Sequence, residues 1–527
     1  MSGGLFEAEA SLASWALGEM KNISRLSKNI VYNFFGQGLL LLLGFVAVKY
    51  VFKHLGEDAL GIIYFTLTMN SVLCTVLELG ISTTTVREVS AHFNDEPEYI
   101  RDLIRTASLF YWGGFLLLAV LVYFGAPFLV EKWINLESMD TATATLVLQI
   151  MGISALVGLP RTLYMSLFRG LQRMEFNNII DVAATALQQF GIILILVMGG
   201  ALLHVVYWIA ASFGICILFY VLAVQRFFSW RALVPGYYPS VVRRNIRYSS
   251  SMTSISLFSM VHLQADKLIV SKLLPIGLFG YYGFASSVIS KSRFLTSAVS
   301  LAAFPSFSSL FKESDRATMM SQYRKLHDFL CFGTVFVFAA IPFATLPLFG
   351  YLFNPEVAET LLLPVTFLTI GYYMNATLYV PYVFSLAVGK PGISARSNFY
   401  ALFVVLPVTA ALIYHFGLAG AGFSWVFYHL FAYSYAIPRI CSQCLEIPAG
   451  QWYLHVFKIL GLIGATYGIA WLFVASGGTY SVSVLAVAYA AASLAFLVCS
   501  YLMIGGELRV TLLRLSQVLR MRRAEIV

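Results

Sequence analysis

Charged residues are scarce in this 527-residue sequence, at 11% of the chain, whereas 59% of the residues are hydrophobic and the mean hydropathy is +0.80. Soluble globular domains carry about 25% charged residues. The apolar runs are also too long and continuous for the alternating strands of about ten residues that form an outer-membrane barrel. Because backbone polar groups in lipid must be satisfied within the segment, the runs predict an all-α polytopic membrane protein.

Signatures of catalysis are absent as well. The sequence has no GxxxxGK[ST] phosphate loop, no HExxH motif and no GxSxG nucleophile motif. Cys441 and Cys444 form one CxxC, but a zinc site would need a second pair or suitably spaced histidines. We therefore expect no enzyme activity, no metal site and no bound cofactor, which leaves a secondary transporter as the interpretation.

Windows of about 19 residues predict fourteen membrane spans. They lie near 29–53, 60–84, 106–130, 144–168, 180–199, 203–224, 248–272, 278–302, 328–353, 360–388, 398–415, 418–437, 455–475 and 481–504. Most of the 34 lysines and arginines fall in connections that would share one side of the membrane with both termini. This excess predicts that both termini lie in the cytoplasm. The membrane that we expect is the cytoplasmic (inner) one. The net charge of +9 therefore indicates orientation and not nucleic-acid binding.

The chain also resembles itself, which predicts two lobes of six helices around a central cavity. A shift of 219 residues aligns the following pairs without gaps: Val51 with Val270, Lys53 with Lys272, Leu55 with Leu274, Gly61 with Gly280 and Phe65 with Phe284. The predicted parts are a cytoplasmic segment at 1–28, lobes at 29–225 and 248–440, a basic linker at 226–247, two further spans within 441–504 and a basic amphipathic tail at 505–527. Two lobes in one chain make a monomer sufficient.

Cations within spans are the main clue to a binding site, because each costs about 2.5–3.5 kcal/mol at a helix centre and so usually faces a partner or a wet cavity. The candidates for a cationic substrate cavity are Lys291, Arg293, Arg161, Lys267 and Lys49. On one continuous helix, Lys291 and Arg293 would point about 200° apart, so both can line one path only if it is wide or wraps that helix. The alternative is that at least one of them is structural. For the other three, the alternative is a side chain that extends to the lipid headgroups.

Few acidic residues fall within the spans. Asp266, Glu78 and Asp181 are candidates to bind a proton or Na⁺ and so to couple transport to an ion gradient. The alternative for each is an ion pair with a nearby lysine or arginine. Asp266 and Lys267 are adjacent, so we do not expect them to face each other on a helix.

Several stretches resemble polysaccharide flippases of the Wzx type. Residues 32–65, YNFFGQGLLLLLGFVAVKYVFKHLGEDALGIIYF, followed by LELGIS at 77–82, are similar to the first two spans of that family. DKLIVSKLLPIGLFGYYGFA at 266–285 resembles the junction of spans seven and eight. FRGLQRMEFNNII at 168–180 and AAFPSFSSL at 302–310 are similar to the inner loops after spans four and eight.

This resemblance implies the multidrug/oligosaccharidyl-lipid/polysaccharide exporter fold. The implied substrate is an oligosaccharide on a polyprenyl pyrophosphate, moved from the inner to the outer leaflet by alternating access for O-antigen or exopolysaccharide assembly. The implied partners are membrane lipids and polysaccharide polymerase or assembly proteins. A net basic cavity suits a pyrophosphate. The alternatives are an ion-coupled multidrug exporter of the same superfamily and a membrane glycosyltransferase or ligase.

Overall fold

The structure is a computed structural model that describes residues 3–476, 481–506, 508 and 509. Side chains are described from Gly38 onwards, except at 251–252, 254–255, 297–298, 300–302 and 475–476. Within these residues the chain is almost entirely helical, and the strand-like pairing is limited to an isolated bridge between Asn135 and Pro275. The predicted tail from residue 510 onwards lies outside the described residues.

The helices follow one another with short connections. The first group is α1 (Gly3–Leu77), α2 (Ile81–His92), α3 (Pro97–Lys132), α4 (Thr141–Ala155), α5 (Gly158–Gly170), α6 (Met174–Val197), α7 (Leu202–Val224) and the short α8 (Trp230–Leu233). The second group is α9 (Pro239–Leu273), α10 (Ile276–Ser290), α11 (Arg293–Lys312), α12 (Arg316–Gly333), α13 (Val335–Leu352), α14 (Pro355–Ala387) and α15 (Gly392–Ile440). The last group is the π-helical turn η1 (Cys441–Leu445), α16 (Ala449–Ile463), the π-helical turn η2 (Gly464–Gly468), α17 (Ile469–Ser476) and α18 (Val482–Met503).

Ten helical runs among the described residues are long and apolar enough to cross a membrane, so this is a multi-pass membrane protein, as predicted. Two of these runs bend at a glycine with positive φ, at Gly56 (φ 83°) and Gly417 (φ 56°). The bent runs have 40 and 54 residues, enough for two crossings of about 20 residues each. Because α9, α10 and α11 are not among the ten runs, the count of fourteen spans stays a prediction.

Two expected spans end differently from the prediction. The span expected at 60–84 stops at Leu77, and the chain turns at Gly80 (φ 64°) before α2 begins. The span expected at 278–302 is divided into α10 and α11 by a turn at Lys291 and Ser292. The second correction bears on the binding site, because both leading cation candidates lie at this break.

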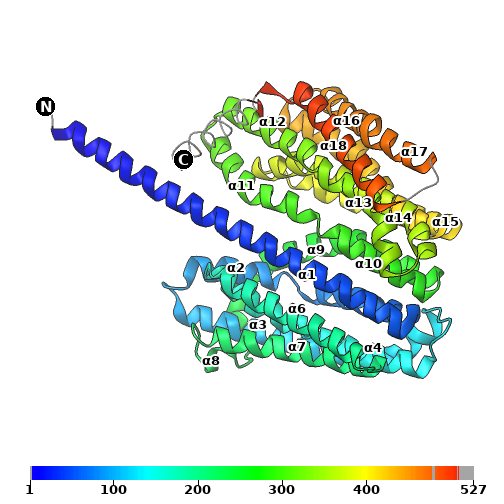
Figure 1. Ribbon diagram of the computed structural model, residues 1–527. Coiled ribbons are helices and arrows are strands. Elements are labelled where there is room, and N and C mark those ends of the chain that lie inside the picture. Colours follow the sequence, from blue (N-terminus) through cyan, green and yellow to red (C-terminus); the bar gives the residue numbers. More distant parts are fainter. Residues whose placement is uncertain (1–2, 477–480, 507, 510–527) are drawn as a thin grey trace, which may run out of the picture.

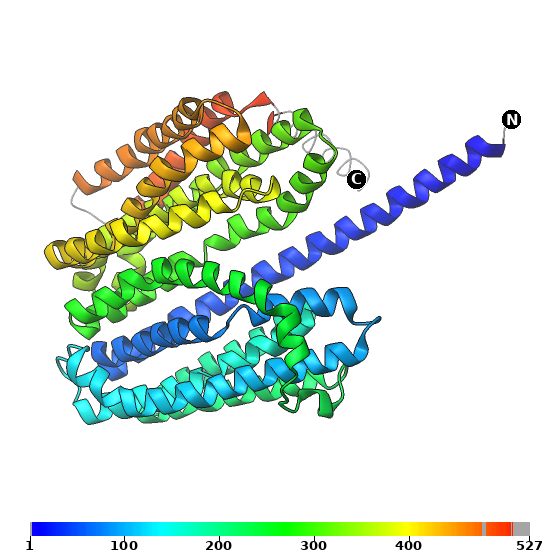
Figure 2. The same ribbon diagram turned by 180° about the vertical axis from the view of Figure 1, so that it is seen from behind.

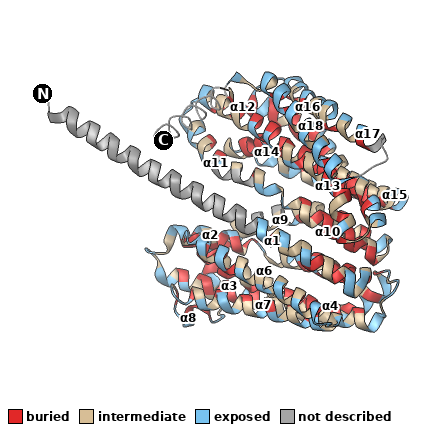
Figure 3. Ribbon diagram, viewed as in Figure 1, coloured by how far each residue is buried: buried red, intermediate tan, exposed pale blue. Residues whose placement is uncertain are grey.

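The helices form an N-terminal half, α1–α7, and a C-terminal half, α9–α15, with α16–α18 packed against α12 and α13. Figure 1 and the reverse view in Figure 2 show the halves as two groups of helices with α1 between them. α1 packs against α6 of its own half and against α10 of the other. In Figure 3 the buried residues gather inside each group and along its contacts with α1 and α10.

The two ends of the bundle differ in how the halves meet. We call the end that contains the connections 133–140, 198–201 and 274–275 the sealed end, and the end that contains 93–96, 171–173 and 225–238 the basic end. Towards the sealed end, one hydrophobic core joins residues of both halves, from Ala47 to Trp425 and beyond. Towards the basic end there are two separate cores, one that runs from Val89 to Val241 and one from Ala303 to Val456.

Two glycines allow the halves to approach closely at the sealed end. A Cβ placed on Gly61 would lie 2.1 Å from the carbonyl oxygen of Ile276, and one placed on Gly280 would lie 2.7 Å from the backbone nitrogen of Gly61. Hydrogen bonds join the halves nearby, from Ile276 N to Asn135 O (2.9 Å) and from Trp133 Nε1 to Ser271 Oγ (3.1 Å). Gly61 and Gly280 are also the pair that the internal sequence alignment matches.

Candidate functional site

A cavity of about 300 Å³ lies between α1, α6 and α10, where the two halves meet. At about 30 Å³ for each water molecule, it has room for about ten. α1 contributes mainly apolar side chains, and most of the polar ones come from α6, from α10 and from the turn that follows α10. The polar lining consists of Tyr64, Asn178, Asp181, Thr185, Gln189, Ser287 and Lys291.

Lys291 supplies the cavity with its positive charge, and it does so from a break in the helix. Around this break the backbone bonds are of the 3₁₀ type, from Lys291 N to Val288 O (3.2 Å) and from Ser292 N to Ile289 O (3.0 Å). A stretch of 3₁₀ geometry in the middle of a helix often marks a hinge. Among the side chains that the structure describes, none forms a hydrogen bond or ion pair with the Lys291 ammonium.

Arg293 begins α11 just beyond the same break, and its side chain is exposed. Tyr372, Tyr428 and His429 of the C-terminal half lie close enough to interact with its charge. Within the described part of the chain, its guanidinium has no hydrogen-bond or ion-pair partner. Because α10 ends at Ser290 and α11 begins at Arg293, the prediction that treated Lys291 and Arg293 as members of one continuous helix is wrong.

Arg161 lies on α5 and pairs with Asp181 on α6 at 2.5 Å. The hydroxyl of Tyr220, on α7, donates to the same carboxylate oxygen at 2.7 Å, and the guanidinium lies 5.6 Å from the centre of the Tyr220 ring. Because Asp181 also lines the cavity, this ion pair places Arg161 beside the cavity wall.

Lys267 and Asp266 form an ion pair at 3.6 Å, contrary to the expectation that these neighbours face apart. The long lysine side chain turns back along α9 and donates to Leu263 O at 2.8 Å, which brings its ammonium near the carboxylate. Asp266 is 2% exposed and also accepts hydrogen bonds from Tyr282 (2.6 Å) and Trp425 (3.0 Å). This pair is a packing feature inside the C-terminal half and does not line the cavity.

The two remaining candidates lie apart from the cavity. The Lys49 ammonium lies 3.1 Å from the centre of the Tyr351 ring, a cation–π contact between α1 and α13. Glu78 follows the last residue of α1 and has Arg169 as its charged neighbour. The structure therefore brings Lys291, Asp181 and Arg161 together, places Arg293 at the adjoining break and separates the others.

The sequence reasoning missed several polar residues of the cavity wall. Tyr64, Ser287 and Thr185 line it without any charge to mark them. A signal was present in α6, where Asn178, Asp181 and Gln189 recur at helical spacing within an apolar run.

Residues 26–311, more than half of the chain, match the family described as polysaccharide biosynthesis protein. The chain belongs to this family. A relative in Shigella flexneri, named as a candidate O-antigen transporter, is 22% identical over 423 residues, which cover 76% of this chain and 93% of the relative. This agrees with the resemblance to polysaccharide flippases seen in the sequence.

Solved structures share the fold. The lipid II flippase MurJ in an inward closed conformation superposes with a TM-score of 0.67 at 13% identity, over 90% of this chain and 98% of that one. A multidrug resistance MATE family transporter of the MOP superfamily, in an inward-facing conformation, gives a TM-score of 0.63 at 10% identity, over 76% and 95% of the two chains. The family, the named relative and the fold all agree with the prediction of a membrane transporter and not an enzyme.

Proposed function

We propose that the protein moves a polyprenyl-pyrophosphate-linked oligosaccharide from the inner to the outer leaflet of the cytoplasmic membrane, for the assembly of cell-surface polysaccharide. Both termini would lie in the cytoplasm, so the basic end would face inwards. The observation that carries the proposal is the ammonium of Lys291, which lies in a cavity between the two halves and has no hydrogen-bond or ion-pair partner among the described side chains. An unpaired cation within a span is costly unless it serves a ligand or an ion path.

The charge balance at the break supports an anionic ligand. Arg161, Lys267 and Lys49 each contact a carboxylate or an aromatic ring, whereas Lys291 and Arg293 have no ion-pair partner in the part of the chain that the structure describes. A lysine binds phosphate as a point charge, and an arginine can grip it with two parallel hydrogen bonds. The pyrophosphate would therefore bind beside the α10–α11 break, and the oligosaccharide would extend between the halves towards the basic end, where their cores are separate.

Alternating access would use the difference between the two ends. The halves would separate at the sealed end and approach each other at the basic end, and the 3₁₀ turn at Lys291 and Ser292 would bend between the two states. Because Lys291 lies in this turn, the charge that holds the ligand would move with the hinge.

Asp181 is the carboxylate best placed to couple this cycle to a proton or Na⁺ gradient, because it lines the cavity and pairs with Arg161. Neutralising Asp181 would release the Arg161 guanidinium towards the ligand. Asp181→Asn is expected to abolish the gradient dependence of transport. Gradient dependence that persists in this variant would assign the coupling to another group, with Asp266 and Glu78 as the next candidates.

The test is transport in proteoliposomes with a fluorescent polyprenyl-pyrophosphate oligosaccharide, in which exposure of the label on each leaflet is followed with and without ion gradients. We expect wild type to flip the substrate, and Lys291→Ala to reduce the rate at least tenfold, since it removes the charge that meets the phosphates. Lys291→Arg should retain part of the rate.

The matched control is Lys53→Ala, which removes an exposed lysine from α1 outside the cavity and should leave the rate unchanged. An unchanged rate in Lys291→Ala would contradict the proposal that the substrate binds in this cavity. Absence of flipping by wild type under every gradient would contradict the proposed substrate and favour the multidrug exporter.

A further inference from the structure

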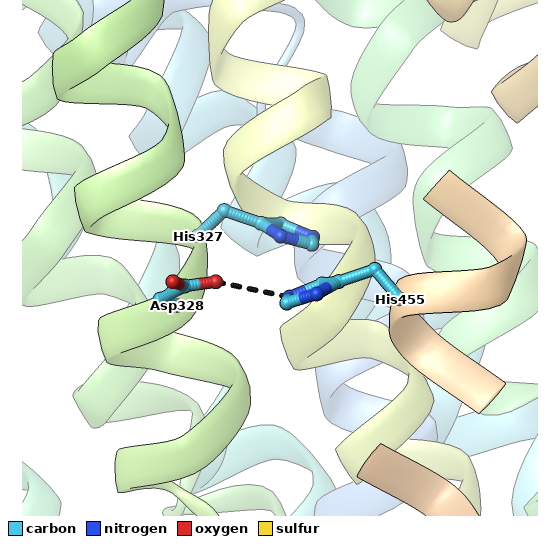
Figure 4. A group of neighbouring side chains, drawn as sticks. All are labelled: His327, Asp328 and His455. Carbon is cyan, nitrogen blue, oxygen red and sulfur yellow. Dashed lines mark ion pairs between the residues drawn. The ribbon is translucent and has the colours of Figure 1, made fainter. Parts of the chain in front are cut away.

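A cluster of three titratable side chains lies outside the cavity, and the proposed transport cycle does not use it. His327 and Asp328 are on α12 and His455 is on α16, and Figure 4 shows the three side chains turned towards one another. One potential ligand atom from each residue lies within 4.8 Å of the other two. Asp328 Oδ1 is 2.9 Å from His455 Nε2.

The cluster is buried on one side and accessible on the other. His327 is 4% and Asp328 6% exposed, whereas the His455 side chain is 33% exposed. Its position is near the basic end, because Asp328 contacts Gly505, which follows the end of α18. An ion could therefore enter from that end without crossing the protein interior.

Backbone groups already hold two of the three side chains in the orientation that a metal ligand needs. His327 Nε2 lies 3.2 Å from the carbonyl oxygen of Thr377, which can only accept a hydrogen bond, so Nε2 carries the hydrogen and Nδ1 keeps a free lone pair. Asp328 Oδ2 accepts from Gly505 N at 3.0 Å, which leaves Oδ1 for the cluster. Outer contacts of this kind typically orient metal-bound histidines and carboxylates.

The third side chain has an unsatisfied atom. His455 Nε2 is buried and lies 2.9 Å from Asp328 Oδ1, an ion-pair distance, but within the described residues it has no hydrogen bond of good geometry. A buried polar atom that lacks a well-directed hydrogen bond is costly. A cation between the three residues would bind His455 Nε2, Asp328 Oδ1 and one ring nitrogen of His327 together.

We propose that His327, Asp328 and His455 bind a divalent transition metal of the zinc class. Two imidazoles and one carboxylate form a known zinc donor set with a fourth position left for water. The donors around a tetrahedral zinc ion lie about 3.4 Å apart, given Zn–N distances of about 2.0–2.1 Å. Separations of up to 4.8 Å would therefore close by at most about 1.4 Å, and the 2.9 Å contact between Asp328 and His455 would open by about 0.5 Å. The bound metal would fasten α16 and the end of α18 to α12.

Zinc binding to the full-length protein, without a polyhistidine tag and stripped of metal by a chelator, tests this site by isothermal titration. Wild type should bind one equivalent of Zn²⁺. His455→Ala and Asp328→Asn should each weaken binding at least tenfold, because each removes a donor. His415→Ala, which removes an exposed histidine from α15, is the matched control and should bind as wild type does.

Thermal unfolding gives a second test. For each variant, the unfolding midpoint is measured with and without Zn²⁺, and the difference between the two values is the readout. Zinc should raise the unfolding midpoint of wild type and His415→Ala, since a ligand that binds the folded state stabilises it, and should leave His455→Ala and Asp328→Asn unchanged. Equal zinc affinity in wild type and His455→Ala, or no midpoint shift in wild type, would overturn the proposal and leave an Asp–His ion pair. Neither readout involves transport, so the result is independent of the proposed function.

Discussion

The sealed end and the basic end join the same two halves by different kinds of contact. At the sealed end, Gly61 and Gly280 bring backbone against backbone within one shared core. At the basic end, the cores are separate and the links are polar, such as the partly exposed Arg244 with Glu96 (2.8 Å) and the buried Asn245 with Tyr99 (2.8 Å). Close packing contributes far more than exposed ion pairs. The conformation described here is therefore set mainly at the sealed end.

The glycine contact also explains why the two halves resemble each other there. Gly61 and Gly280 occupy equivalent positions under the shift of 219 residues, and they lie against each other. Contact between equivalent residues is what a two-fold relation produces close to its axis. The breaks in the chain agree with this, because the same shift aligns Gly56, where α1 bends, with Pro275, which precedes α10.

The largest effect on stability is expected at the loop that closes the sealed end. Asp58 is 2% exposed, and its Oδ2 accepts hydrogen bonds from the backbone nitrogens of Glu137 (3.0 Å), Ser138 (2.6 Å) and Met139 (2.9 Å). Asp58→Ala removes the buried carboxylate that accepts these three hydrogen bonds and should lower the free energy of unfolding by about 3 kcal/mol, since hydrogen bonds to charged groups are the stronger ones. Unfolding in mixed detergent and SDS micelles measures this change.

The control for this variant is Asp95→Ala, which removes an exposed carboxylate near the basic end. It should leave the unfolding free energy unchanged. Equal losses in the two variants would contradict the claim that the sealed end dominates.

A smaller loss is expected from one added methyl group between the halves. Gly61→Ala places a Cβ against the Ile276 carbonyl and should cost about 1–3 kcal/mol by forcing the backbones apart. Gly113→Ala adds the same atom on α3, where nothing lies within 4 Å, and should be neutral or slightly stabilising. Equal unfolding midpoints for the two variants would contradict close backbone packing between Gly61 and Ile276.

The smallest effect is expected at the basic end. The Arg244 guanidinium holds the pKa of Glu96 below its usual range, chiefly through their hydrogen bond. A carboxyl group with a lowered pKa stabilises the folded state above its ordinary pKa, and this contribution is lost as the pH falls through the lowered value. The Arg244→Ala variant should therefore have a slightly lower unfolding midpoint than wild type at neutral pH. In acid the two midpoints should be equal. A gap that persists at low pH would show that the arginine acts by packing.

Composition and periodicity are sufficient to predict a helical membrane protein. The internal alignment pairs Gly61 with Gly280 from the sequence alone. The break at Lys291 could not be predicted, because residues 288–296, VISKSRFLT, contain neither proline nor glycine and suit a continuous helix. Its 3₁₀ turn depends on tertiary packing, which a local pattern does not contain.

The side-chain pairings show the same limit. Arg161 and Asp181 lie on consecutive helices joined by a short loop, so sequence reasoning could list an ion pair among the alternatives. The contact between Lys49 and Tyr351 joins residues about 300 positions apart in the sequence. The ion pair between His455 and Asp328 joins α12 to a helix outside the two halves. Such contacts follow from how the helices pack, and a single sequence does not specify that packing.

The most direct test of the account measures distances across both ends during transport. Spin labels at exposed positions would report on each end, with Arg173 and Lys312 for the basic end and Glu131 and Glu356 for the sealed end. When substrate and an ion gradient are supplied, we expect a population with a shorter distance between the two basic-end labels. We expect a matching population with a longer distance between the two sealed-end labels. Flipping that continues while both distances stay fixed would contradict alternation between the two ends.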